Sequence, residues 1–101
     1  MNSTTHVPTE NARRYLGQFV KHFAHKLPAR LEDDLRHGEV EFPSGLCTMD
    51  ADDHRLAIIL NAGAAEELTR LQDVVDRHLL RFAFREALSI TWENSWTTQP
   101  A

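Results

Sequence analysis

The sequence predicts an α+β domain in which two helices cover one face of a mainly antiparallel sheet. Two segments, one near each end of the chain, carry apolar residues at the spacing of a helix. Between them, and again after the second, apolar and polar residues alternate with the period of a strand. Two one-sided helices and a one-sided sheet pack most simply as a two-layer sandwich with both helices on the same face.

The first helix is expected to start near Thr9, a candidate N-cap, and to end before Pro28. Proline cannot continue a helix and disfavours helical geometry in the residue before it. The polar residues 1–7 are expected to form a mobile N-terminal segment. The buried stripe of this helix follows the 3.6-residue period. It consists of Ala12, Tyr15, Leu16, Phe19, Val20, Phe23 and Leu27.

Short strands are expected after the first helix, connected by turns rich in Gly, Pro, Ser and Asp. The strands cover residues 29–33, 39–42, 46–51 and 55–61, the first being the weakest. Such short connections favour an antiparallel meander. Ile59 and Leu46 are expected on the uncovered face, which suits either a homodimer surface or ordinary scattered surface aliphatics.

The second helix is expected over residues 64–82, with acidic residues in its first turn and basic residues in its last, as the helix dipole favours. A last strand is expected over residues 88–93. The element order is therefore α-β-β-β-β-α-β, with four or five strands. These elements form a single domain over residues 8–93, followed by a polar C-terminal tail over residues 94–101.

Composition excludes several classes of function. The formal net charge is −4, which argues against nucleic-acid binding because phosphate recognition needs clustered Lys and Arg. The longest mostly apolar run is about half the ~20 residues that a membrane span requires. The N-terminus lacks the pattern of a signal peptide, and a single cysteine rules out an internal disulfide. A cytoplasmic location is therefore expected.

Four residues are candidates for a small zinc or iron site. His22 and His25 are three residues apart on the first helix, His78 is on the apolar stripe of the second, and Cys47 is in a strand. The alternative is that the histidines have ordinary packing and surface roles and that Cys47 is a small buried hydrophobe. A Cys–His pair in a small enzyme is a further alternative, and it would need an accessible thiolate beside a base.

Basic residues near the helix ends are candidates for contact with an anion or a partner. Lys26 follows the first helix, and Arg81 and Arg85 flank the end of the second. Guanidinium groups bind carboxylates well, although an Arg85–Glu86 ion pair would explain part of this pattern structurally. The sequence contains no Gly-rich phosphate loop, no nucleophile elbow and no paired catalytic carboxylates.

Several blocks of this sequence, taken together, resemble a bacterial family, the domain of unknown function 2218. The blocks occur in the family's order and the resemblance spans residues 7–93. They are residues 22–26, 42–48, 71–79 and 81–86, followed by Trp92.

The resemblance implies a cytoplasmic domain that stands alone or is joined to a siderophore-interacting, flavin-dependent ferric reductase. The family pattern includes positions matching His22, His25, Cys47 and His78. The favoured interpretation is a non-enzymatic binding or accessory module linked to iron or siderophore metabolism. Its ligand would bind near the end of the first helix, and a siderophore-interacting reductase would be its partner. A small enzyme that uses Cys47 and His22, or a structural homo-oligomerisation domain, remain alternatives.

Overall fold

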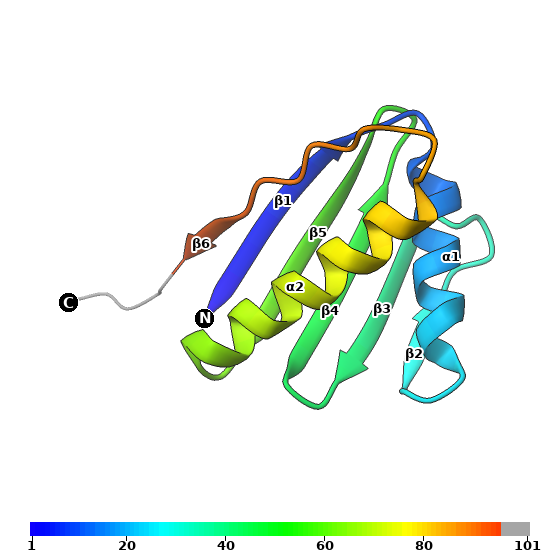
Figure 1. Cartoon of the computed structure of the whole chain (residues 1–101). Coiled ribbons are helices and arrows are strands. Elements are labelled where there is room, and N and C mark those ends of the chain that lie inside the picture. Colours follow the sequence, from blue (N-terminus) through cyan, green and yellow to red (C-terminus); the bar gives the residue numbers. More distant parts are fainter. Residues whose placement is uncertain (96–101) are drawn as a thin grey trace.

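A six-stranded antiparallel sheet is covered on one face by two helices in the computed structural model, which describes residues 1–95 (Figure 1). The strand order across the sheet is β2-β3-β4-β5-β1-β6. This confirms the α+β sandwich predicted from the sequence, although the sheet has six strands where four or five were expected. The elements in chain order are β1 (Asn2–Pro8), α1 (Ala12–Ala24), β2 (Ala29–Leu31), β3 (His37–Phe42), β4 (Gly45–Ala51), β5 (Arg55–Ala62), α2 (Ala65–Phe82) and β6 (Glu93–Ser95).

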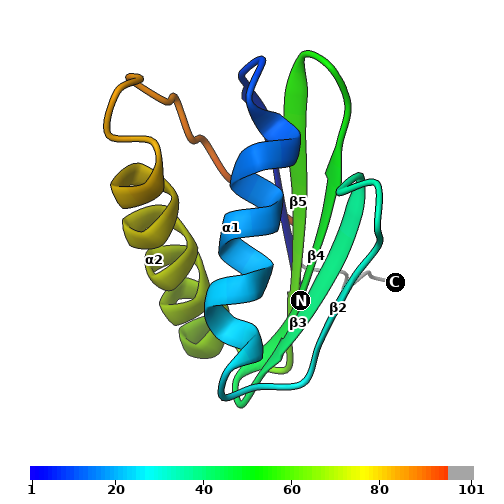
Figure 2. The same cartoon turned by 90° about the vertical axis from the view of Figure 1, so that its right-hand side faces the viewer.

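Both helices lie on the same side of the sheet, as Figure 2 shows edge-on. α1 packs mainly on β2 and β3, whereas α2 packs on β5 and β4, and the two helices also contact each other. Within the described residues, neither helix is long and apolar enough to cross a membrane. The two amphipathic helices predicted from the sequence are confirmed, and the observed ends of α1 and α2 lie within a few residues of the predicted ends.

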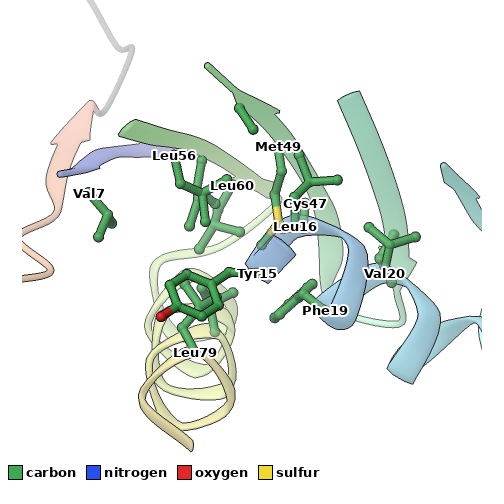
Figure 3. Packing of buried hydrophobic residues seen from close by; sticks show 14 of the residues in the cluster. Val7, Tyr15, Leu16, Phe19, Val20, Cys47, Met49, Leu56, Leu60 and Leu79 are labelled. Carbon is green, nitrogen blue, oxygen red and sulfur yellow. The ribbon is translucent and has the colours of Figure 1, made fainter. Parts of the chain in front are cut away.

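The hydrophobic core fills the space between the sheet and the helices (Figure 3). Phe19 of α1 is its largest fully buried side chain, and Leu16 of α1 and Cys47 of β4 lie in the same core. The opposite face of the sheet is open, and Ile59 is 43% exposed on it, as the alternation in β5 predicted. The other large side chains that are fully buried are Met49, Leu56, Ile58, Leu60, Leu68, Leu71, Leu79, Val7, Val20 and Val40.

The prediction of a mobile N-terminal segment over residues 1–7 was wrong, because this segment forms β1. β1 pairs along its whole length with β5, from Asn2 opposite Asn61 to Pro8 opposite Arg55, and also pairs with β6. Ser3, Thr5 and Val7 face the core in strict alternation. Two of these three are polar, so the alternation carries no hydrophobic signal, although threonine is β-branched and favours strands.

The last strand was predicted over residues 88–93, but of that range only Glu93 lies in a strand. Leu88, Ile90 and Trp92 do pack against the core, and the Trp92 indole Nε1 donates to Asp76 Oδ1 at 2.9 Å. The alternation therefore signals one-sided burial of an extended segment and not pairing of its backbone. β6 (Glu93–Ser95) extends into the segment assigned to the polar tail over 94–101, and residues 96–101 of that tail lie outside the described residues.

Candidate functional site

Two histidines from different helices lie side by side. His22 projects from α1 and His78 from α2, and their ring centres are 5.1 Å apart. His22 is exposed and His78 is half-buried, so a ligand can reach both rings. The structure thus brings together two of the four residues that the sequence suggested as metal ligands.

Aromatic rings surround the histidine pair. The ring of Phe23 is 4.9 Å from that of His22 and 4.8 Å from that of His78. The ring of Phe82 is 5.7 Å and 6.2 Å from the same two histidines. On each helix the contributing residues are up to four positions apart and therefore share a face. The pair consequently lies against packed rings that restrict its movement.

One ring nitrogen of His78 is already committed to the backbone. Nδ1 lies 2.6 Å from the carbonyl oxygen of Val74, one helical turn earlier. A carbonyl can only accept, so Nδ1 carries the proton and Nε2 of the neutral ring keeps its lone pair. A hydrogen bond of this kind is what orients histidines that bind metals through the opposite nitrogen.

The charges around the pair are positive. Partial burial lowers the pKa of His22, and the neighbouring His78, His25, Arg81 and Lys26 lower this pKa further. His22 is therefore neutral at pH 7 and has a lone pair to offer. A small cavity of about 170 Å³ beside His78 is lined by Arg77 and Arg81 as well. Arg77 is paired with Asp73, so the charges of Lys26 and Arg81 are the ones that attract an anion and repel a free cation.

The other two proposed metal ligands do not join the pair. His25 is the exposed C-cap residue of α1 and makes no ring contact among residues 1–95. Cys47 is 1% exposed in the core, where burial raises the pKa of its thiol to about 12. A thiol with that pKa is protonated at neutral pH and is a poor nucleophile and a poor metal ligand.

A resident zinc or iron ion does not fit this arrangement. Within the part of the chain that the structure describes, no three His, Cys, Asp or Glu side chains are placed to hold a metal. Structural zinc takes about four protein ligands and catalytic zinc about three. The site offers two imidazoles, which is enough only for a metal that arrives with ligands of its own.

The three basic residues proposed to contact an anion, Lys26, Arg81 and Arg85, do not form one site. Lys26 and Arg81 lie close enough to His22 to affect its pKa. Arg85 lies elsewhere, since it lines a second cavity together with Tyr15 and does not line the cavity that contains Arg81. Arg81 and Arg85 therefore line different cavities.

A polar cluster that the sequence analysis did not anticipate surrounds Glu86. Its carboxylate accepts hydrogen bonds from Thr9 Oγ1 at 2.9 Å, from Asn11 Nδ2 at 2.8 Å and from the Tyr15 hydroxyl. The expected Arg85–Glu86 pairing is not found among the described residues, and Asn11, not Thr9, is the N-cap of α1. No local signal could reveal this cluster because Glu86 is more than 70 residues from each of its three partners.

This cluster predicts a specific loss of stability in acid. Hydrogen bonds from Tyr15 and Asn11 lower the pKa of Glu86 below its ordinary 4.5. A lowered pKa adds stability above the unfolded-state pKa, and this contribution is lost as the pH falls through the folded-state pKa. We expect Glu86→Gln to cost about 1 kcal/mol at pH 7, because water screens this part-exposed cluster. Urea unfolding from pH 7 to pH 3 should then show a shallower acid loss in the variant, and parallel curves would contradict this role.

A second polar cluster lies on the open face of the sheet. His37 of β3 contacts Asp50 of β4 through Nδ1 at 2.7 Å and Glu39 through Nε2 at 3.3 Å. The hydrogen bond to Asp50 is the main cause that raises the pKa of His37. His37 is directly opposite Asp50 in the β3–β4 hairpin. Pairing the two predicted strands in this register would have revealed the contact from the sequence. The homodimer through the open face, where Ile59 lies, stays a prediction.

The fold and the histidine pair define a small α+β domain with a two-imidazole, positively charged site between its helices. The chain belongs to the family described as an uncharacterized protein conserved in bacteria (DUF2218), whose model matches residues 4–93. It is similar to PA4090 from Pseudomonas aeruginosa, solved by NMR, at 36% identity and a TM-score of 0.76. The match covers 91% of this chain and 94% of the other. No curated protein matches the chain.

Proposed function

We propose that this protein is a non-enzymatic binding module that takes an anionic metal chelate at the His22–His78 pair. The observation that carries this proposal is the pairing of two imidazoles at 5.1 Å between their ring centres. A metal about 2.1 Å from each ring nitrogen lies about 3.2 Å from each ring centre, so two imidazoles at adjacent coordination positions are roughly 4.5–5.3 Å apart. The measured separation falls inside this range.

The charge around the pair supports a chelate over a bare ion. Lys26 and Arg81 adjoin the two histidines and disfavour a free cation, whereas Arg77 beside them is paired with Asp73 at 3.0 Å. A chelator supplies the missing ligands and can give the complex a net negative charge. The exposed position of His22 suits a ligand that is taken up and released.

Iron is the metal that we favour. Siderophores are chelators that carry ferric iron, and the family resemblance associates such domains with siderophore-interacting, flavin-dependent reductases. We therefore propose such a reductase as partner and the cytoplasm as location, with the module presenting the chelate. The enzyme alternative finds no support in Cys47, whose thiol is buried and protonated at neutral pH.

The test uses a chelate that leaves two adjacent coordination positions open. We expect untagged protein to bind nickel nitrilotriacetate, and ferric nitrilotriacetate, with a Kd at least about tenfold weaker in His22→Ala and in His78→Ala. His25→Ala is the matched control because His25 is exposed on the same helix end and lies outside the pair. Isothermal titration calorimetry measures each Kd.

Charge is tested separately from coordination. Arg81→Gln should weaken binding of nickel nitrilotriacetate, which is a monoanion. It should not weaken binding of free Ni²⁺ to the imidazoles. Absence of chelate binding, or equal losses in His25→Ala and His22→Ala, would overturn the proposal. Since His78 contacts the core residue Phe19, the fold of each variant should be checked by its amide NMR spectrum.

A further inference from the structure

A second cavity lies between the start of α1 and the turn that follows α2. Its volume is about 410 Å³, which is within the range of small-molecule sites. Asn11, Tyr15 and Glu86, members of the polar cluster described above, are part of its lining. The remaining lining includes two arginines and two phenylalanines, which are Arg14, Arg85, Phe82 and Phe84.

The aromatic part of the lining is unusually accessible. Phe84 is 75% exposed, the highest value among the large apolar side chains described. A large aromatic ring left in water suits a surface that a ligand covers, because covering it removes apolar area from water. The Arg85 guanidinium lies 5.3 Å from the centre of the Phe84 ring, so a cation–π contact joins charge and ring at the cavity.

The positive charges of Arg14 and Arg85 are available to bind an anion. Neither Arg14 nor Arg85 forms an ion pair among residues 1–95. Arg14 also lines a neighbouring cavity with Asp52 and Asp53, and neither carboxylate is at ion-pair distance from it. The one carboxylate in the lining, that of Glu86, is occupied by neutral donors.

We propose that this cavity binds a small aromatic carboxylate. The ring would stack against Phe84, and the carboxylate would bind the guanidinium groups of Arg14 and Arg85, whose planar forks match it. The negative charge of Glu86 in the lining disfavours a doubly charged phosphate and favours a monoanion. This site needs no metal and shares only Phe82 with the surroundings of the histidine pair.

Benzoate is the probe, titrated into the full chain without metal and followed by amide NMR. We expect shifts concentrated in residues 11–15 and 84–86, and a Kd at least about tenfold weaker in Arg85→Gln and in Phe84→Ala. Arg70→Gln is the matched control, because Arg70 is exposed on α2 and lines none of the cavities described here. These side chains are exposed, so the variants should fold.

Two further probes separate the contributions of charge and ring. Benzamide keeps the ring without the charge and acetate keeps the charge without the ring, so both should bind at least about tenfold more weakly than benzoate. Tighter binding of phenyl phosphate would overturn the carboxylate assignment. Shifts located elsewhere, no shifts, or an equal loss in Arg70→Gln would overturn the site. None of these outcomes depends on His22 or His78, so this site and the chelate site fail independently.

Discussion

Replacing Phe19 by alanine is expected to lower the free energy of unfolding by about 3–5 kcal/mol. Phe19 is fully buried, and its ring packs at 4.9 Å from that of Phe23 and at 6.4 Å from that of Phe42. Removing the ring leaves a cavity at the junction of α1, α2 and the sheet, which the surroundings can only partly fill. A domain of this size has only about 5–15 kcal/mol of stability in total.

The matched control for this prediction is the same chemical change at Phe84. Because Phe84 is 75% exposed, Phe84→Ala should change the free energy of unfolding by no more than about 0.5 kcal/mol. Urea unfolding followed by far-UV circular dichroism measures both variants. A loss below about 1 kcal/mol in Phe19→Ala would mean that the core repacks around the missing ring.

Replacing Gly45 by alanine is expected to cost about 3 kcal/mol, because β4 starts in a place with no room for a side chain. A Cβ atom at Gly45 would lie 2.3 Å from the Asn61 carbonyl oxygen and 2.9 Å from Leu71 Cδ1. The nearer atom belongs to the backbone of β5, so relief requires a shift of one strand against the other. Gly45 is opposite Ala62 in this pairing.

Gly63 provides the control, since it follows β5 directly and has space around it. A Cβ atom at Gly63 would meet nothing closer than Glu67 Oε1 at 3.8 Å. Gly63→Ala should therefore change stability by less than about 1 kcal/mol, in either direction. Thermal unfolding of the two variants side by side is the measurement. An unchanged midpoint in Gly45→Ala would show that the end of β4 can separate from β5 without cost.

The helices and the middle strands were predictable because their apolar residues repeat at the period of the element. The stripe that includes Phe19 in α1 and the one that includes Leu79 in α2 both lie in the core. β1 was missed because its inward residues include Ser3 and Thr5, which give no hydrophobic pattern. The last strand was misplaced because packing of one side of an extended segment produces the same alternation as pairing.

The candidate sites were predictable only in part, for a geometric reason. His22 and His78 each stood out in the sequence, but their meeting depends on how two helices pack, which a single periodicity does not determine. The Glu86 cluster joins residues from opposite ends of the described chain, while the sequence suggested only a pairing of Glu86 with its neighbour Arg85. Cys47 was expected first as a small buried hydrophobe, and its burial in the core is confirmed.

The insertion of β1 between β5 and β6 has a consequence for biosynthesis. Pairs such as Asn2 with Asn61 join residues more than half the chain apart. During synthesis β1 therefore stays unpaired until the ribosome has translated β5. Topologies dominated by such distant pairs fold slowly and expose unpaired strands to aggregation. The polar sequence of β1, with Pro8 at its end, makes it a poor nucleus for intermolecular sheets. The polar residues of β1 that give no hydrophobic periodicity therefore also reduce its tendency to aggregate before β5 has been synthesised.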